Sequence, residues 1–146
     1  MKIGIAGLGV VGSACKAGFE KCGYDVSVHD PKFFTNLNDI VNTEIVYICV
    51  PTPAKQDGTC DTSIVHDTIV ELLRLRYEGV IAIKSTITPG TTQDFIDRYS
   101  DRIVFVPEFL KERSAEYDFV FDHKLLLVGT ETVSYTHLTL PTILRV

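Results

Sequence analysis

The sequence has little positive charge, no basic stripe and no long hydrophobic run. Its 14 Lys and Arg residues are outnumbered by 19 Asp and Glu residues, which gives a formal net charge of −5 at pH 7. Because a nucleic-acid backbone is bound by clustered Lys and Arg side chains, we expect no nucleic-acid partner. No segment approaches the roughly 20 apolar residues of a membrane-spanning helix, and residues 1–6 lead into a short apolar run instead of a secretion signal. We therefore expect no membrane partner and a cytoplasmic location.

Cysteine is also sparse. The four cysteines have neither the spacing of a metal site nor the density of a disulfide-rich secreted protein, so we expect no metal. Cys15, Cys22 and Cys49 fall in a predicted helix and a predicted buried strand, and we interpret them as small buried hydrophobic side chains. Cys60 lies in a predicted loop, where it should be more accessible.

Strand-like and helix-like segments alternate along the 146 residues, a length that suits one domain. Most of the strand candidates are rich in Ile and Val without polar alternation, as in parallel strands covered on both faces; they span residues 2–6, 25–29, 44–50, 80–84, 102–106 and 124–128. Helical patterns occupy residues 11–21, 61–77 and 91–99. The apolar face predicted for the second helix comprises Ile64, Val65, Thr68, Ile69, Leu72 and Leu73. This alternation predicts a Rossmann-type, doubly wound α/β fold with a mainly parallel sheet and helices on both faces.

The last residues differ in character from the rest. Residues 133–138 read like the translation of a transposon-end adaptor used in preparing DNA libraries. We therefore expect one domain over residues 1–130 and a non-native tail over residues 131–146. A genuine terminal strand and coil is the alternative, and neither interpretation gives the tail a function.

Gly7, Gly9 and Gly12 form a G-x-G-x-x-G string between the first predicted strand and the first predicted helix. In this setting the string is typical of a dinucleotide-binding turn. The first glycine permits the tight turn, the second lets a pyrophosphate approach the backbone, and the third allows helix and strand to pack closely. N–H groups at the start of the helix, where Val10 and Val11 lie, can then hold the phosphates.

Asp30 ends the second predicted strand, where a carboxylate can accept both ribose hydroxyls of an adenosine. Its charge would repel a 2′-phosphate, which favours NAD over NADP, and the nearby Lys32 moderates that preference. The alternative interpretation is an ordinary tight turn followed by a solvated charge.

Three further segments follow the carboxyl ends of predicted strands, where α/β sheets form their ligand crevice. They are Val50-Pro51-Thr52-Pro53 with residues 57–61, Ser85-Thr86 with Pro89-Gly90-Thr91, and Pro107-Glu108-Phe109-Leu110-Lys111-Glu112 with Ala115 and Asp118. With the glycine string, they resemble in order and spacing the NAD-binding part of the UDP-glucose/GDP-mannose dehydrogenase family, and most of all its UDP-glucose-oxidising members. The resemblance covers essentially everything before the tail.

The resemblance implies an enzyme that oxidises the C6 alcohol of a UDP-sugar, UDP-glucose to UDP-glucuronate, with two NAD. Thr86 and Glu112 would position a water that handles protons, and Glu108 would lie near the reacting centre. The sugar-nucleotide pocket would be lined by Glu108, Phe109, Leu110 and Lys111. The cofactor would meet Val50, Pro51, Thr52, Ser85 and Thr86. From residue types alone, a helix cap at Ser85-Thr86 and a solvated face at Glu108 and Glu112 stay open.

The sequence also departs from the family. None of its cysteines matches the nucleophilic cysteine of the family's C-terminal domain, and the lysine and asparagine of the central helical domain are missing too. We expect this chain alone to be inactive and the parent enzyme to be a homodimer. The alternatives are part of a GDP-mannose or hydroxyacid dehydrogenase, or a non-enzymatic NAD-binding module. Reduction of NAD with a UDP-sugar or with a hydroxy acid would distinguish the two kinds of dehydrogenase from each other. A non-enzymatic module should be stable alone, whereas part of an enzyme should expose the apolar surface that its missing domain would cover.

Overall fold

The computed structural model describes residues 1–121 and 127–129. One parallel sheet of order β2-β1-β3-β4-β5 is built from β1 (Lys2–Ala6), β2 (Asp25–His29), β3 (Ile45–Ile48), β4 (Val80–Ile83) and β5 (Ile103–Phe105). β3 and β4 are buried at every position because helices cover both faces of the sheet. The predicted doubly wound α/β fold is confirmed.

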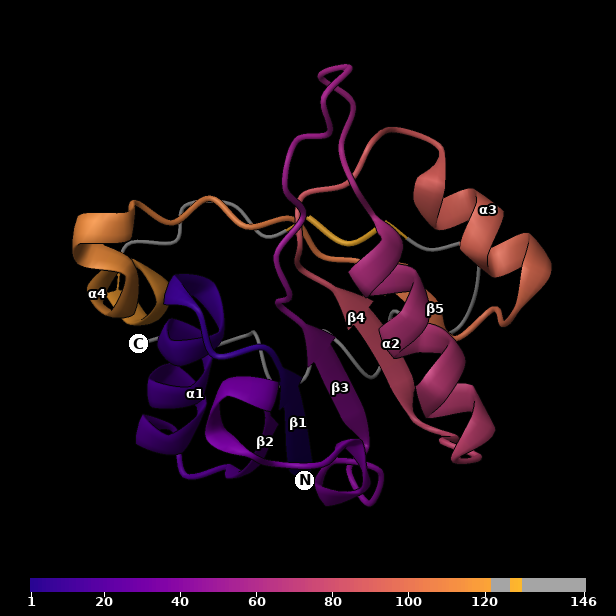
Figure 1. The fold of residues 1–146 in the computed structure, drawn as a ribbon. Coiled ribbons are helices and arrows are strands. Elements are labelled where there is room, and N and C mark those ends of the chain that lie inside the picture. The colour runs from indigo at the N-terminus through magenta and orange to yellow at the C-terminus, as the bar shows by residue number, and fades with distance from the viewer. Residues whose placement is uncertain (122–126, 130–146) are drawn as a thin grey trace.

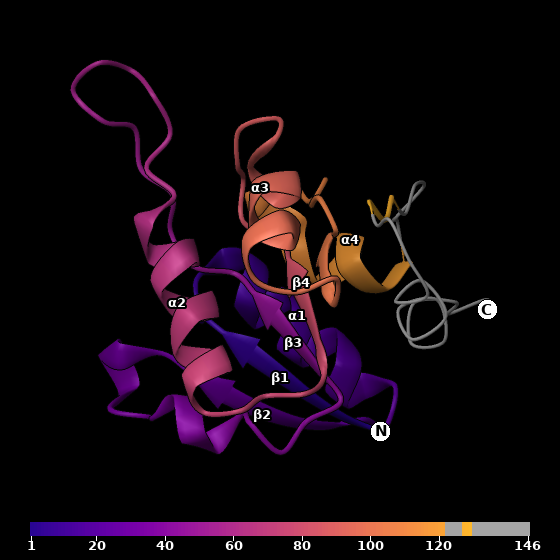
Figure 2. The ribbon, with the colours of Figure 1, turned by 90° about the vertical axis from the view of Figure 1, so that its right-hand side faces the viewer.

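The helices form a layer on each side of this sheet. Figures 1 and 2 show α1 (Val10–Lys21) and α4 (Ala115–Phe121) on one face, and α2 (Ser63–Arg74) and α3 (Thr91–Arg98) on the other. Three short 3₁₀ turns, η1 (Pro31–Phe33), η2 (Leu37–Asp39) and η3 (Glu112–Ser114), lie in the connections. The core is accordingly in two parts, one including Ile5, Cys15, Phe19 and Tyr47, the other including Ile48, Val65, Ile69, Ile83 and Phe95.

The strand order creates a crevice at the carboxyl edge of the sheet. From β1 the chain moves to β2 on one side and then crosses to β3 on the other. The loops after β1 and β3 therefore diverge to opposite faces, and such a switch point is where open α/β sheets bind ligands.

α4 is packed against α1 through a glycine. A Cβ at Gly18 would lie 2.2 Å from the Phe119 ring, so only a residue without a side chain lets the ring approach the helix. Phe119 also packs edge-to-face on Phe19, with ring centroids 5.2 Å apart. This contact fixes the segment between β5 and α4 against α1.

Two details of the predicted second helix are wrong. α2 ends at Arg74 and not near residue 77, because Arg76 has a φ of 58°, a left-handed conformation that a helix cannot contain. Ile64 is 43% exposed although it was predicted to face inward. It lies in the first turn of α2, which Figure 1 shows beyond the ends of β3 and β4, so no sheet residue covers it.

The cysteine prediction is confirmed for Cys15, which is fully buried. Cys22 and Cys49 are only half-buried, because Cys22 ends α1 and Cys49 lies just past β3. The strand predicted over residues 124–128 lies largely outside the described residues. Just after it, the described Gly129 forms an antiparallel bridge to Phe105. The predicted tail is outside the described residues altogether. No helix in the described ranges is long and apolar enough to cross a membrane.

Candidate cofactor site

The glycine turn between β1 and α1 has the backbone geometry that its residue types suggest. Gly7 has a φ of 94° and donates its N–H to the His29 carbonyl at 2.7 Å. A Cβ at Gly12 would lie 1.8 Å from the Gly7 carbonyl oxygen, so helix and strand are in closest approach there. Gly9 has open space instead, with no atom within 4 Å of where its Cβ would stand. A pyrophosphate can therefore approach the backbone at Gly9 and meet the first N–H groups of α1.

Asp30 lies at the end of β2 with its carboxylate directed at this turn. Oδ2 accepts the Leu8 N–H at 2.7 Å and Oδ1 accepts the Lys32 N–H at 2.9 Å. The Leu8 hydrogen bond is the main reason that the pKa of Asp30 lies below its ordinary value, and it outweighs the effect of desolvation. Each carboxylate oxygen keeps a second acceptor position, so the group is oriented and able to accept the two hydroxyls of a ribose.

The loop after Asp30 is closed by Thr35. The Thr35 hydroxyl accepts the Asp30 N–H at 2.7 Å, and the His29 ring lies 3.1 Å from the Thr35 carbonyl. Between them the chain makes η1 and reaches Phe34, which has a φ of 56° and is 98% exposed. His29 thus helps to fix the loop that follows Asp30.

The loops after β3 and β4 are connected to each other. The Ser85 hydroxyl donates to the Val50 carbonyl at 2.7 Å, and the Ser85 N–H bonds to the Ile48 carbonyl at 3.1 Å. The Cys60 thiol lies 3.9 Å from the Thr52 carbonyl and 3.5 Å from the Thr86 carbonyl. Ser85 is buried and Thr86 is exposed, so the serine holds the loops together while the threonine faces outward.

Residues 53–61 extend away from this edge as a narrow excursion, visible above the sheet in Figure 1. Ala54 and Cys60 form an antiparallel bridge, and the Asp61 N–H donates to the Pro53 carbonyl at 2.8 Å. Near the tip, the Asp57 carboxylate accepts the Thr59 hydroxyl and N–H, and these bonds lower its pKa. The D-G-T part of the sequence motif therefore shapes a turn.

Glu108 is paired with a lysine that the sequence analysis did not select. Its Oε2 lies 2.6 Å from Lys84 Nζ, and its Oε1 accepts the Phe109 N–H at 2.9 Å. Lys84 directly follows β4 and Glu108 follows β5, so the pair connects the carboxyl ends of neighbouring strands. A lysine at the end of an apolar strand is rarely buried without a partner, and that was the signal available in the sequence.

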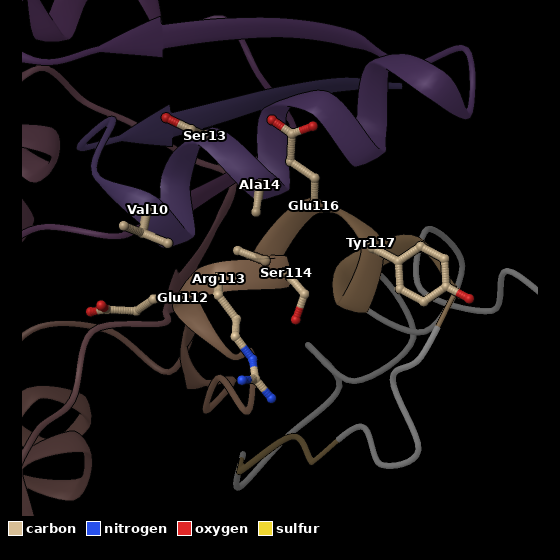
Figure 3. A pocket seen from close by; sticks show the side chains of 9 residues that line it. Val10, Ser13, Ala14, Glu112, Arg113, Ser114, Glu116 and Tyr117 are labelled. Atoms are coloured by element: carbon tan, nitrogen blue, oxygen red, sulfur yellow. The ribbon is translucent and has the colours of Figure 1, made fainter.

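Glu112 lies against α1. It lines a cavity of about 380 Å³ formed by η3, α4 and the first turns of α1, together with Val10, Ser13 and Arg113. Figure 3 shows the Glu112 side chain beside Val10, the first residue of α1. The structure therefore brings the segment after β5 to the end of α1 where phosphates are expected.

Asp118 holds that segment in place. Its Oδ2 accepts the Lys111 N–H and the Ser114 hydroxyl, both at 3.0 Å, and the Lys111 bond is the main cause of its lowered pKa. The sequence motif contained Asp118 but gave it no role. The spacing was the available signal, because an acidic residue four positions after a serine in a turn can bond back to it.

The predicted site residues thus lie along one edge of the sheet. The turn residues Gly7, Gly9, Val10, Val11 and Gly12 come first, then Asp30 and Lys32, then Val50, Pro51 and Thr52, and then Ser85 and Thr86. Glu108, Phe109, Leu110, Lys111 and Glu112 follow β5, with Phe109 59% exposed. In the ranges that the structure describes, no group of three metal-ligating side chains occurs.

A parallel sheet of this order, with a glycine turn before α1 and a carboxylate at the end of β2, defines the NAD-binding Rossmann domain of a dehydrogenase. Residues 31–140 match the model of the UDP-glucose/GDP-mannose dehydrogenase family, NAD binding domain. The chain belongs to this family.

Individual relatives agree with this assignment. The chain is 33% identical over 102 residues to a UDP-glucose 6-dehydrogenase of Rickettsia typhi, covering 64% of this chain and 24% of that protein. It is 35% identical over 95 residues to one of Streptococcus pneumoniae, covering 62% and 24%. The chain thus spans about a quarter of the length of these relatives.

Solved structures show the same fold. A UDP-glucose dehydrogenase from Pyrobaculum islandicum superposes with a TM-score of 0.83 at 22% identity, over 97% of this chain and 43% of that one. A GDP-mannose dehydrogenase from Pseudomonas aeruginosa gives a TM-score of 0.80 at 19% identity, over 97% and 44%.

Proposed function

We propose that this chain is the NAD-binding part of a dehydrogenase that oxidises the C6 alcohol of UDP-glucose to the carboxylate with two NAD. The observation that carries the proposal is that the segment after β5 lies against α1, with Glu112 beside Val10. This arrangement brings a carboxylate from the P-E-F-L-x-E segment to the cofactor helix. The identity to the Rickettsia and Streptococcus UDP-glucose 6-dehydrogenases supports the choice of substrate.

The residues of the chain itself fit NAD. Asp30 would accept the hydroxyls of the adenosine ribose, and the N–H groups of Val10 and Val11 would hold the pyrophosphate above Gly9. NAD, when bound, supplies the hydride acceptor. The backbone of Val50 to Thr52, fixed by Ser85, would position its second ribose and nicotinamide.

The proton chemistry would fall to the exposed groups at the same edge. Thr86 and Glu112 are both exposed, and together a hydroxyl and a carboxylate can hold one water for general base work on the sugar alcohol. Glu108, fixed by Lys84, would stand near the reacting carbon. Phe109, Leu110 and Lys111 would line the sugar-nucleotide pocket. The thiol that captures the intermediate aldehyde would come from outside this chain, and the parent enzyme would be a cytoplasmic homodimer.

The test uses the longest reading frame that carries residues 1–130, because the relatives are about four times as long as the matched part. Purified protein is mixed with NAD and UDP-glucose, and NADH is followed by absorbance. We expect two NADH for each UDP-glucose and UDP-glucuronate as product. If NADH forms with GDP-mannose alone, the substrate is a different nucleotide sugar of the same family. If NADH forms with hydroxy acids alone, the proposal of a sugar substrate is wrong. Binding of NAD without reduction by any of these would favour a non-enzymatic module.

A further inference from the structure

The Lys84–Glu108 ion pair is the least expected charged feature of the site. The Lys84 side chain is only 6% exposed and that of Glu108 is 16% exposed. Stability alone does not explain such a buried pair, because buried ion pairs add little to the free energy of unfolding compared with apolar groups of the same size. A buried pair at the carboxyl edge of a cofactor site therefore calls for a functional explanation.

Both members of the pair make a further contact, and the Glu108 carboxylate is the more exposed of the two. Glu108 accepts the Phe109 N–H on its free oxygen, and the Lys84 ammonium lies 5.9 Å from the Phe119 ring. Burial acts to lower the pKa of Lys84, but the interactions with Cys15, with Glu108 and with Cys49 together outweigh burial, and the pKa is raised. The site thus contains a deep positive charge and a shallower negative charge.

The nicotinamide end of the cofactor should lie close to this pair. Asp30 at the end of β2 would hold the adenosine ribose and α1 begins after β1, so a bound dinucleotide would run across the strand ends towards β3 and β4. Neighbouring strands are about 4.8 Å apart, which puts β4 at roughly 14 Å from β2. An extended dinucleotide covers that distance. Lys84 follows β4 and Glu108 comes after its neighbour β5, so the second half of a bound dinucleotide would come close to them.

We propose that the Lys84–Glu108 pair sets the relative affinity of the site for NAD⁺ and NADH. The nicotinamide ring is cationic in NAD⁺ and neutral in NADH, so only the oxidised form responds strongly to a nearby charge. The more exposed Glu108 carboxylate attracts the cationic ring, and Lys84 weakens that attraction. The site therefore binds NAD⁺ more tightly than NADH, but by a limited factor. The inference rests on the assignment of NAD and not on the sugar substrate.

The test is a set of titrations of this chain with NAD⁺, NADH and ADP-ribose, which has no nicotinamide. A unit charge about 8 Å from the ring, at an effective dielectric constant between those of a buried site and water, changes binding by about tenfold. Lys84→Met removes the positive charge, so the ratio of the Kd for NADH to the Kd for NAD⁺ should rise about tenfold. Glu108→Gln removes the negative charge, so the ratio should fall about tenfold.

Two controls separate charge from damage to the fold. Lys84→Arg keeps the charge, so it should leave the ratio within about threefold of the wild type. The double variant K84M/E108Q removes both charges, so its ratio should fall below that of the wild type, but by less than in Glu108→Gln. ADP-ribose should bind every variant within about threefold, because it does not reach the pair. A structural role alone would weaken NAD⁺ and NADH by one common factor, and that result would overturn the inference.

Folding is checked by circular dichroism before each titration. If Lys84→Met does not fold, Glu108→Gln decides alone, because Glu108 lies nearer the surface and its replacement is nearly isosteric. An unchanged ratio in Glu108→Gln overturns the inference. If the wild-type chain does not bind ADP-ribose, both the NAD assignment and this inference are wrong. If the parent enzyme is inactive with UDP-glucose but the Kd ratio of this chain still shifts in opposite directions in the two variants, only the proposed sugar reaction is wrong.

Discussion

Replacing Gly12 with alanine should destabilise the domain, because α1 packs directly against the backbone of the glycine turn at this residue. The new Cβ would stand 1.8 Å from the Gly7 carbonyl oxygen and 2.9 Å from its carbon. Both neighbours are backbone atoms, and Gly7 itself is fixed by its N–H bond to His29. No rotamer change can relieve the contact, so α1 must move away from β1.

The cost can be bracketed from the packing. Inserting a methyl group into a well-packed core costs about 1–3 kcal/mol, and a clash with backbone belongs at the upper end. In a domain of this size 1 kcal/mol corresponds to about 3–5 °C in Tm, so Gly12→Ala should lower Tm by roughly 10 °C. Displacing α1 also moves its first N–H groups, so NAD affinity should fall as well. Thermal unfolding followed by circular dichroism measures the first effect and titration with NAD the second.

Gly9→Ala is the matched control, since it adds the same methyl group three residues earlier. No atom lies within 4 Å of that Cβ and Gly9 has a φ of −72°, so the fold accommodates it. The poorer helix cap and the less flexible unfolded chain offset each other to within about 1 kcal/mol. The methyl group instead occupies the space of the pyrophosphate, so NAD binding should be lost while Tm is kept. A Gly12→Ala protein as stable as wild type, or a Gly9→Ala protein that binds NAD normally, would refute this account of the turn.

Three further predictions concern the side chains that shape the site. Asp30→Asn should weaken NAD binding about tenfold or more, because a charged acceptor of two ribose hydroxyls is lost; it should also narrow the difference between NAD and NADP, and equal loss for both cofactors would contradict the role of the charge. Gly18→Ala should lower Tm, because its Cβ would lie 2.2 Å from the Phe119 ring. Adding Phe119→Ala removes the ring, so it should recover the part of the Tm loss that comes from this clash and little more. If the Tm losses of the two single variants simply add in the double variant, the two residues are not in contact. Asp118 has a lowered pKa, so its stabilisation is present above the ordinary aspartate pKa of about 4 and is lost as pH falls through the folded-state value. The Tm difference between wild type and Asp118→Asn should therefore shrink as the pH falls below about 4, and a constant difference would rule out the linkage.

The fold could be predicted from the sequence because its signals are local. Each parallel strand is a short run of apolar residues, and the glycine string states its own backbone geometry, as the φ of 94° at Gly7 confirms. Ile64 was misplaced for the same reason, since periodicity describes a helix and not the extent of the sheet beneath it.

The contacts between distant segments could not be predicted. Lys84 was interpreted as the end of a strand, and its partner Glu108 lies 24 positions later. Gly18 belongs to the first helix and Phe119 to the last, so neither residue shows in the sequence that one fits the other. A single sequence carries no record of such pairs, although burying a charge without a partner is costly enough that Lys84 itself pointed to one.

The two ends of the site control charge in different ways. At the proposed adenosine end, backbone N–H groups fix Asp30 and carry no net charge, so the carboxylate, moderated by the nearby Lys32, would oppose a 2′-phosphate. At the other end, a lysine fixes Glu108 and also cancels most of its charge. The first arrangement suits a group that must exclude one cofactor, and the second suits a group that must let the ring of the cofactor change charge during the reaction. In the proposed complex, the partner of each carboxylate would thus match the group that it faces: backbone N–H groups where the bound group keeps its charge, and a lysine where the charge of the ring changes.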